Sequence, residues 1–325
     1  MNKKPFITVL MTVYNRENVC NTIDSILNQS YNNFEFLIID NASTDRTREV
    51  ILSYKDPRIR LVVNDKNMGQ TYSLNRGLEL ASGKYIARID SDDIALPHRL
   101  EKQVQFLEDN SDYGLVGSWV TYIDDDNKLT ITMKMPVTNE GFMVMQKISC
   151  AMYHPAAMYR TSIIRLNNIK YDYDIHMAED YDLWRQLSQY SKVLNLPEVL
   201  IYYRKGGSND SVRHADLMYD ECFSVRTKIC KYLDYDKGML TEICLEKKKK
   251  KTIMDCIRIY NYLNNFLRKN ISVDSQDFDI IKEHIRYRVV STCIHYNDSF
   301  YALIIRVIYK RLKRLFYYVA KITKN

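Results

Sequence analysis

Apolar and polar positions alternate along about the first ninety residues in two different rhythms. Short apolar runs of strand length, rich in β-branched residues, occupy residues 7–13, 34–39, 59–63 and 85–89. Between these runs, apolar side chains recur at helical spacing, as Ile23 and Ile26 or Leu74 and Leu78 do. Strands that alternate with helices through short connections predict an α/β fold with a Rossmann-like, mostly parallel central sheet and helices on both faces.

A polar cluster follows each of the four predicted strands. The clusters are residues 12–15, 40–45, 64–67 and 90–93. The carboxyl ends of parallel strands meet at one edge of a sheet, and ligands bind in the crevice beyond that edge. Loops are polar in any protein, but four such clusters in the same position predict a binding site there.

Further along, the pattern predicts a second, less regular half of the same body. We expect a helix after Pro97, a strand at 115–123, a helix at 139–148, an extended piece at 154–159, helical turns at 160–166, a helix that opens with Glu179 and Asp180, a strand at 199–204 and a loop at 206–209.

Helical patterns dominate after about residue 213, and the charge balance changes. Residues 241–325 hold 18 Lys and Arg against 8 Asp and Glu, whereas residues 1–240 hold 29 against 32, and the five lysines at 247–251 are typical of a solvated helix face or linker. Near the C-terminus, apolar residues recur at helical spacing among basic ones: Ile304, Ile308, Leu312, Leu315, Val319 and Ile322. A basic amphipathic helix either packs on the protein's own core or lies in an anionic membrane surface, and the excess of Lys and Arg favours the membrane.

Composition narrows the class of protein further. Apolar residues make up 46% and charged residues 27% of the chain, which argues against a disordered protein. The seven cysteines contain no C-x-x-C pair, so a zinc site or a disulfide framework is disfavoured. The N-terminus lacks the apolar core of a signal peptide, and no run of about 18 apolar residues occurs. We therefore expect a cytoplasmic protein that is peripheral on the inner face of the cell membrane.

Two groups of carboxylates are the candidate chemistry. Asp90, Asp92 and Asp93 follow the fourth strand, and Glu179 and Asp180 open a later helix. Crowded carboxylates require a cation or raise one another's pKa, and Mg2+ or Mn2+ takes such oxygen ligands together with substrate phosphates. The alternatives are an acidic surface turn for the first group and simple complementation of the helix dipole for the second.

The carboxylates fit the transfer of a group away from a diphosphate. An ion held by Asp92, with Asp90 nearby, would stabilise the diphosphate leaving group. Asp40 could accept the imide N–H of uracil, and Asp180, supported by Glu179, could remove the proton from an incoming hydroxyl. Neither a G-x-G-x-x-G after the first strand nor a P-loop occurs, which disfavours dinucleotide and P-loop chemistry. Glycoside hydrolases instead need two carboxyl groups that flank the scissile bond and no metal at the leaving group, so the predicted metal site favours a transferase.

Six segments in order carry a resemblance to a known family. They are I-T-V-L-M-T-V-Y-N, F-L-I-I-D-N-A-S-T-D, N-M-G-Q-T-Y-S-L-N-R-G, A-R-I-D-S-D-D, H-P-A-A-M-Y-R and E-D-Y-D-L-W, within about residues 5–210. The chain resembles an inverting glycosyltransferase of family 2, with the GT-A fold, of the bacterial polysaccharide or lipopolysaccharide type. The segment A-R-I-D-S-D-D stands at the family's D-x-D position.

The resemblance implies roles for individual residues. Nucleotide contacts fall on Thr12, Tyr14, Asn15, Asp40, Asn67, Arg88 and Asp90. Asp92, with Asp90, becomes the ligand of Mn2+ or Mg2+, and Asp180 becomes the catalytic base with Glu179 beside it. The remaining candidates are Asp93, His154 and Trp184 for the donor or acceptor sugar, and His154 or His214 as a further metal ligand. Thr12 departs from the family, which often has Pro there, and this affects the turn rather than the chemistry.

We therefore expect three regions: a nucleotide-sugar-binding half at 1–115, an acceptor-binding half at 116–213, and a basic helical region at 214–325 that associates with an anionic membrane. The expected reaction moves a hexosyl or N-acetylhexosaminyl group from a UDP-sugar to a hydroxyl of a glycan or lipid-linked acceptor, with inversion. The alternatives are a catalytically idle GT-A-like protein whose basic tail binds nucleic acid or membrane, and a nucleotidyltransferase. We expect no nucleic acid partner, because the basic residues lack interleaved stacking aromatics.

Overall fold

The computed structural model describes residues 6–205, 214–233 and 253–295. The chain divides into two compact units, Met1–Arg226 and Thr227–Asn325. The predicted loop at 206–209, the lysine run at 247–251 and the basic amphipathic helix near the C-terminus all lie outside the described residues. None of the described helices combines the length and the apolar character that a membrane crossing requires.

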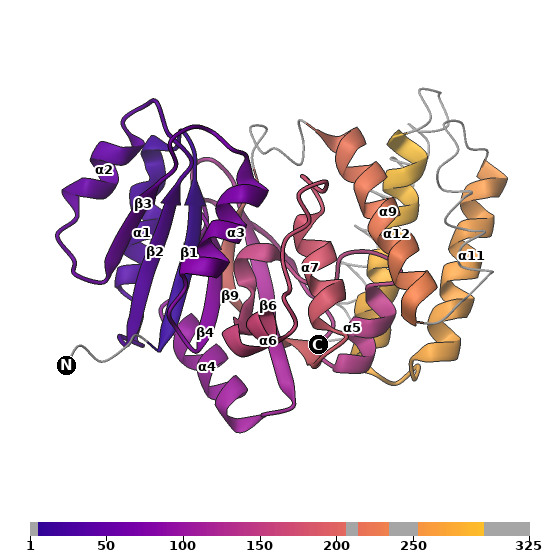
Figure 1. Ribbon diagram of the computed structural model, residues 1–325. Helices are drawn as coiled ribbons and strands as arrows, with labels where there is room; N and C mark the ends of the chain where they lie inside the picture. The colour runs from indigo at the N-terminus through magenta and orange to yellow at the C-terminus, as the bar shows by residue number, and fades with distance from the viewer. Residues whose placement is uncertain (1–5, 206–213, 234–252, 296–325) are drawn as a thin grey trace, which may run out of the picture. The chain divides into compact units, whose positions relative to one another are not determined.

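The predicted alternation of strands and helices is confirmed in the first part of the chain (Figure 1). Four strands form the parallel part of one sheet: β1 (Ile7–Val13), β2 (Phe34–Asp40), β3 (Ile59–Val63) and β4 (Tyr85–Asp90). The short turn η1 (Glu17–Val19) and the helices α1 (Cys20–Leu27), α2 (Thr47–Ser53) and α3 (Gln70–Leu80) connect them. Strand β1 lies at the centre of this part, between β2 and β4.

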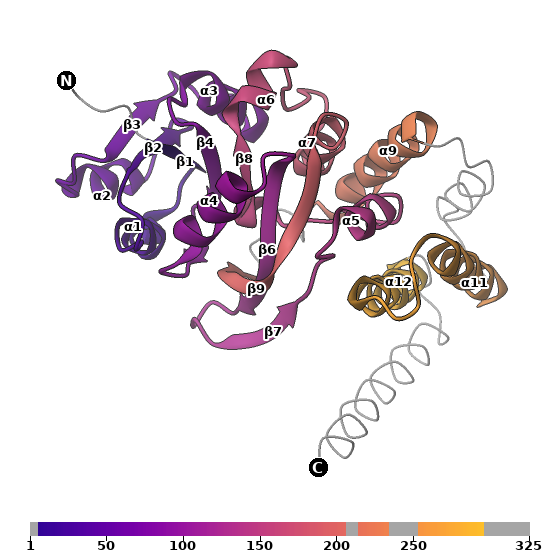
Figure 2. The same cartoon turned by 90° about the horizontal axis from the view of Figure 1, so that it is seen from below.

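Helices cover both faces of these strands, as the sequence predicts. Figure 2 shows α1, α2 and α4 (Arg99–Asp109) on one side of the sheet and α3 and α6 (Thr161–Leu166) on the other. On the α3 side, a Cβ atom on Gly77 would lie only 2.3 Å from Cδ1 of the buried Leu10. Glycine at position 77 therefore lets α3 approach β1 closely.

The second half of the sheet is mixed rather than parallel. It contains β5 (Ile94–Ala95), β6 (Tyr113–Ile123), β7 (Leu129–Met133), β8 (Met158–Arg160) and β9 (Lys192–Arg204). The strand order is β3-β2-β1-β4-β8-β6-β9-β5, with β7 paired to β6. Strand β8 is antiparallel to both β4 and β6, whereas β6 and β9 are parallel. The α/β fold is thus confirmed, and its antiparallel pairs belong to the less regular part of the sequence.

Strand β9 begins seven residues before the predicted strand at 199–204. Its register with β6 skips from the pair Ser118–Leu196 to the pair Trp119–Val199, so Pro197 falls in an irregularity of the ladder. Proline cannot donate to a ladder and is tolerated at such bulges. Because Pro197 interrupts the apolar pattern, the sequence predicts only the second half of this strand.

Helix α7 (Glu179–Leu187) and the part of α9 (Ala215–Leu233) up to Arg226 belong to the larger unit. Helix α7 begins at the predicted acidic pair, and α9 follows the segment at 206–213. Helix α5 (Asn139–Met145) is shorter than predicted, and the short turn η2 (His154–Ala156) leads into β8. The described part of the smaller unit contains α11 (Ile253–Asn270) and α12 (Gln276–His295), whose buried apolar residues include Leu263, Leu267, Ile281 and Ile285. A C-terminal helical region is thus confirmed.

Candidate functional site

The carboxyl ends of the first four strands meet at one edge of the sheet. The register pairs Val13 with Asp40 and Asp40 with Val63, and on the other side of β1 it pairs Thr12 with Asp90. The four polar segments that follow these strands therefore lie side by side, as the sequence predicts. In an open α/β sheet, this edge is where a ligand crevice forms.

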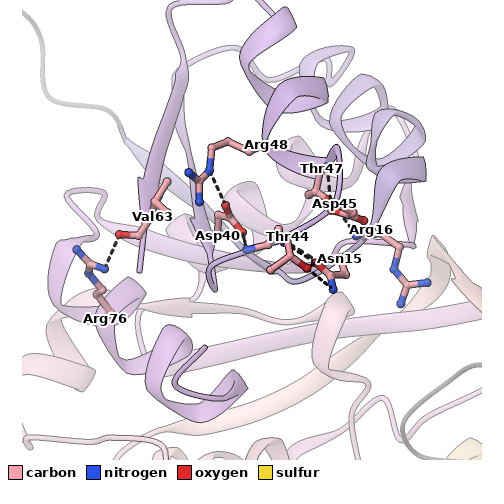
Figure 3. A network of polar contacts seen from close by, with 10 residues as sticks. Asn15, Arg16, Asp40, Thr44, Asp45, Thr47, Arg48, Val63 and Arg76 are labelled. Carbon is pink, nitrogen blue, oxygen red and sulfur yellow. Dashed lines mark hydrogen bonds and ion pairs between the residues drawn. The ribbon is translucent and has the colours of Figure 1, made fainter. Parts of the chain in front are cut away.

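Asp40 ends β2 and has a fully buried carboxylate. Its Oδ1 accepts the backbone N–H of Ser43 at 2.9 Å, and its Oδ2 lies 3.2 Å from Nε of Arg48 on α2 (Figure 3). Ala42, which lies between Asp40 and Ser43 in the chain, has a φ of +63°, in the left-handed region that residues other than glycine rarely adopt. The turn after β2 is therefore held in one shape around the Asp40 carboxylate.

Asn15 joins the segments after β1 and β2. Its backbone N–H donates to Oγ of Ser43 at 3.0 Å, and its Oδ1 accepts the backbone N–H of Thr44 at 2.9 Å (Figure 3). Tyr14, next to it, is 45% exposed. Thr12 is nearly buried and accepts a hydrogen bond from Nη2 of Arg88 at 3.3 Å. Tyr14 and Asn15 are both exposed, and Asn15 is also hydrogen-bonded to the turn after β2, whereas Thr12 is nearly buried.

Asn67 shapes the turn between β3 and α3. Its Oδ1 accepts Nδ2–H of Asn41 at 2.7 Å and the backbone N–H of Gly69 at 3.0 Å, where Gly69 has a φ of +85°. Arg76 of α3 donates to the backbone oxygen of Val63 at 3.0 Å and so fixes the end of β3 (Figure 3). The side chain of Asn67 thus joins its own turn to the segment that follows β2.

Arg88 lies behind the strand edge rather than on it. Its side chain is 1% exposed, and its Nη2 lies 2.6 Å from Oδ1 of Asp90. Its Nη1 donates to the backbone oxygen of Ile89. Arg88 therefore neutralises Asp90 from the interior and has almost no surface of its own for a ligand.

Asp92 and Asp93 face different partners. Oδ2 of Asp92 lies 3.4 Å from Nη2 of Arg16, whereas Asp93 is buried and accepts the backbone N–H of Arg204 at 2.7 Å. Burial raises the pKa of Asp92, and the nearby charge of Asp90 raises it further. The pKa of Asp93 is raised well above its ordinary value by the same two causes. Asp93 thus points into the protein, toward β9, and does not present its carboxylate to a sugar.

Asp90 and Asp92 fit a divalent ion that shares its ligands with a substrate. Within the described ranges, no three His, Cys, Asp or Glu side chains converge as a complete metal site. The side chains of Asp90 and Asp92 are 29% and 18% exposed, and each is paired with one arginine. Mg2+ is usually bound by one or two carboxylates plus substrate phosphates. The donor set is therefore suited to an ion that arrives with a diphosphate and is unsuited to a closed, protein-only metal site.

The acidic pair at the start of α7 faces the same edge. Gln70, at the start of α3, donates its Nε2–H to Oε1 of Glu179 at 2.9 Å, and Thr71 donates to the backbone oxygen of Ile175 at 3.0 Å. Oδ2 of Asp180 lies 3.8 Å from Sγ of Cys150. These contacts hold the first turn of α7 beside the segment that follows β3.

Burial raises the pKa of both Glu179 and Asp180. The charge of Asp180 further raises the pKa of Glu179, and the charge of Asp90 contributes to both shifts. Carboxylates that merely complemented a helix dipole would be stabilised as anions, and their pKa values would fall. The raised values indicate a protonatable pair that senses the charge at the end of β4, as acid–base residues at active sites commonly do.

His154 and Trp184 pack in the interior. Trp184 is fully buried, His154 is 7% exposed, and their ring centroids lie 5.9 Å apart at a steep angle. Nε2 of His154 lies 2.8 Å from the hydroxyl oxygen of Tyr171, and burial holds the pKa of His154 well below its usual range. Neither side chain offers a surface to a sugar in this structure. His214 is exposed and immediately precedes α9.

Three arginines at the edge were not among the predicted site residues: Arg16, Arg48 and Arg204. Arg204 donates through Nε to the backbone oxygen of Asp92 at 3.0 Å, from 112 positions along the chain. A buried carboxylate needs a cation or a set of donors, but the sequence does not say which cation supplies it. Only the folded chain brings Arg16 and Arg204 to Asp92.

Comparisons with known proteins agree with this geometry. A family model described as Glycosyl transferase family 2 matches residues 8–166. An uncharacterized glycosyltransferase of Methanocaldococcus jannaschii is 36% identical over 210 residues, which cover 62% of this chain and 71% of that protein. The O-antigen biosynthesis glycosyltransferase WbnJ of Escherichia coli is 33% identical over 67% of this chain and 86% of its own length. The UDP-Glc:alpha-D-GlcNAc-diphosphoundecaprenol beta-1,3-glucosyltransferase WfaP of Escherichia coli is 32% identical over 61% of this chain and 76% of its own.

Solved structures share the fold. TarS 1-349 of S. aureus, in complex with UDP-GlcNAc, superposes with a TM-score of 0.59 at 16% identity and covers 89% of both chains. The mannosyltransferase PcManGT of Pyrobaculum calidifontis, in complex with GDP-Man and Mn2+, superposes with a TM-score of 0.58 at 14% identity over 94% of this chain and 87% of that one. With its GT-A fold and these relatives, the chain belongs to glycosyltransferase family 2.

Proposed function

We propose that this glycosyltransferase moves a sugar from a UDP-sugar to a hydroxyl of a glycan or lipid-linked acceptor, with inversion at the anomeric carbon, in cell-surface polysaccharide synthesis. One observation carries the proposal. The hydrogen bond from Gln70 to Glu179 holds the acidic start of α7 at the strand edge that also holds Asp40 and Asp90. A base, a leaving-group site and a nucleotide site therefore adjoin one another.

Asp40 is the residue that we assign to the nucleotide base. Its carboxylate is an acceptor at the end of β2 that is buried and paired with Arg48 in this structure, so the Arg48 side chain would have to move aside for uracil to offer the imide N–H that cytosine lacks. Arg48, which is 44% exposed, pairs with Asp40 from the rim. The exposed ring of Tyr14 and the turn around Asn15 would border the same base.

Asp90 and Asp92 are assigned to the diphosphate end of the donor. A bound Mg2+ or Mn2+ would supply Lewis-acid stabilisation of the charge that develops on the leaving diphosphate. Arg88 holds Asp90 in place from the interior, and Arg16 pairs with Asp92 at the position that the ion would take. The presence of Mn2+ with a nucleotide sugar in the mannosyltransferase PcManGT supports this assignment, although that protein shares only the fold.

Asp180 is assigned as the general base. Its raised pKa lets the carboxylate accept a proton from an acceptor hydroxyl near neutral pH. The acceptor oxygen would form a bond to the anomeric carbon from one side while the bond to the diphosphate breaks on the other. Such a single displacement inverts the anomeric centre. Glu179, fixed by Gln70 and with its pKa raised to about 8 by burial and the charge of Asp180, would stay protonated and leave a single negative charge on the pair.

We assign a separate role to each of three regions of the chain. Residues 1–115 carry the nucleotide side, residues 116–213 would carry the acceptor side, and residues 214–325 would bring the enzyme to an anionic membrane on the cytoplasmic side. The E. coli relative named as a glucosyltransferase acting on a diphosphoundecaprenol-linked sugar supports both a UDP-sugar donor and a lipid-linked acceptor. Vesicle flotation with and without residues 296–325 tests the membrane association: equal recovery on anionic vesicles would contradict it.

The function is tested by release of the nucleoside diphosphate from a panel of donors, UDP from UDP-sugars and GDP from GDP-mannose, in the presence of Mn2+ or Mg2+. We expect one UDP-sugar to be turned over well above the others, and the turnover to fall on addition of EDTA. Replacement of Asp180 by Asn should keep donor binding and lower turnover by about 10²- to 10⁴-fold, to a measurable residual rate. Binding of UDP without turnover of any donor, with or without polysaccharide-type acceptors, would support the idle binding protein instead.

A further inference from the structure

The first half of α9 holds the segment that leads into α7. The carboxylate of Glu221, which is 8% exposed, accepts three successive backbone N–H groups at Oε2: His176 at 3.0 Å, Met177 at 2.6 Å and Ala178 at 3.2 Å. Ala178 directly precedes the Glu179–Asp180 pair. Successive amides that converge in this way form a concave site for an anion, and here the chain fills that site itself.

The segment held by Glu221 has no strand or helix of its own. Residues 171–178 form turns and bends, so their position depends on contacts from elsewhere. Helix α3 supplies three hydrogen bonds on one side: Thr71 donates to the backbone oxygen of Ile175, and Asn75 bonds both the backbone oxygen and the backbone N–H of Tyr171. Glu221 supplies the charged contact, and hydrogen bonds to a carboxylate are about twice as strong as neutral ones.

A second contact from α9 is made to the segment that contains Cys150, which lies beside Asp180. Arg226, which is 2% exposed, donates from Nη1 to the backbone oxygen of Ile148 at 3.1 Å. Ile148 is two residues from Cys150, whose Sγ lies 3.8 Å from Oδ2 of Asp180. Figure 2 shows α9 beside α5 and α7, the helices that these two segments adjoin. Helix α9 therefore touches the chain on both sides of Asp180.

We propose that Glu221 is a positioning residue for Asp180, which sets where the base carboxylate meets the acceptor hydroxyl. The inference rests on the proposed function, because it takes Asp180 as the base. Glu221 is buried against backbone amides, so it is not placed to contact a donor. A displacement of about 1 Å at a reacting group can cost about 100-fold in rate, which gives Glu221 leverage on turnover without any contact with substrate.

The test is steady-state kinetics of the full chain with Glu221→Ala. We expect kcat to fall by about 10- to 100-fold while the donor KM and the UDP dissociation constant change by less than about twofold. Glu221→Gln keeps one acceptor oxygen and should lose less activity. The matched control is Asp220→Ala, which removes an exposed carboxylate from the neighbouring position of α9 and should leave kcat unchanged.

A double-mutant cycle separates positioning from a general structural role. In an Asp180→Asn background, Glu221→Ala should cost less than about twofold more, because residues that act as a unit have non-additive effects. A full additional loss in that background, or a raised donor KM with unchanged kcat, would overturn the inference. Circular dichroism checks folding, and if Glu221→Ala fails to fold, Glu221→Gln carries the same cycle.

The two levels of the proposal fail differently. If Asp180→Asn alone leaves turnover unchanged, the base assignment is wrong and the role of Glu221 falls with it. If Asp180→Asn lowers turnover to its residual rate but Glu221→Ala and Glu221→Gln leave kcat intact, only the positioning role is wrong.

Discussion

Nη2 of Arg16 lies 3.4 Å from Oδ2 of Asp92, so a cation from the segment after β1 neutralises a carboxylate at the end of β4. Arg16 is 36% exposed and its backbone N–H is fixed by Oγ1 of Thr47 at 2.6 Å, which keeps the residue beside the strand edge. A divalent ion at Asp92 would have to compete with this arginine. The ion pair therefore predicts how the metal affinity should respond to mutation.

Replacement of Arg16 by Gln should strengthen the binding of Mn2+ in the absence of nucleotide. Partly exposed ion pairs contribute up to about 1 kcal/mol, which corresponds to about a fivefold lower dissociation constant once the competing charge is gone. Titration calorimetry with Mn2+ measures it. Arg46→Gln, which removes an exposed arginine paired with Glu49 on α2, is the control and should change nothing. Unchanged or weaker binding in Arg16→Gln would show that Asp92 is not the ligand.

Replacement of Asp40 by Ala should weaken the binding of UDP by about 10- to 100-fold, because a hydrogen bond to a charged acceptor contributes about 1.5–3 kcal/mol. The binding of CDP should weaken much less, so the preference for UDP over CDP should shrink. Calorimetry with the two nucleotides measures the ratio, with Glu49→Ala on the exposed face of α2 as control. An equal loss for both nucleotides would mean that Asp40 shapes the turn and does not read the base.

The layout of this edge could be predicted because it depends on neighbours in sequence. Each strand is a short apolar run that ends in its own polar segment, so Asp40 and Asp90 could be placed at the carboxyl edge from the pattern alone. The pairing of strands in register then brought them together. Strand β9 was predicted only in part, because Pro197 interrupts its apolar pattern at a bulge.

The partners of these residues could not be predicted in the same way. Arg204 meets Asp93 from 111 positions away, and Glu221 meets Ala178 from 43 positions away. Trp184 has an aromatic side chain suited to sugar stacking, yet α7 is buried around most of its surface and the indole is in the core. Local pattern gives residue types and strand ends, whereas side-chain direction and long-range pairing need the tertiary structure.

Turnover should rise with pH through about neutrality. Burial and the charge of Asp90 raise the pKa of Asp180 to about 7, and only the deprotonated carboxylate can accept a proton from the acceptor. We expect kcat to fall about tenfold per unit below that pKa, with a single-proton slope. Donor binding measured at the same pH values is the control, since it should fall less steeply. A flat profile between about pH 5.5 and 8 would exclude Asp180 as the base whose ionisation limits the rate.

The same raised pKa should make Asp180 costly for stability. The folded protein keeps the proton up to about pH 7, whereas the unfolded chain releases it near the ordinary pKa of 3.8, so folding stability is lost as the pH rises between these two values. Asp180→Asn removes the ionisable group. The variant should therefore melt at a higher temperature than the wild type at pH 8, by about 2–4 °C for each ~1 kcal/mol recovered, and show little difference near pH 4.

Thermal unfolding of Asp180→Asn and wild type at the two pH values measures this difference. Asp174→Asn, at an exposed position shortly before α7, is the control and should show no gain that depends on pH. A gain of equal size at pH 4 and pH 8 would point to altered packing rather than to the removed charge. A loss of stability at pH 8 would mean that the folded protein stabilises the ionised carboxylate of Asp180. In that case the pKa of Asp180 is not raised.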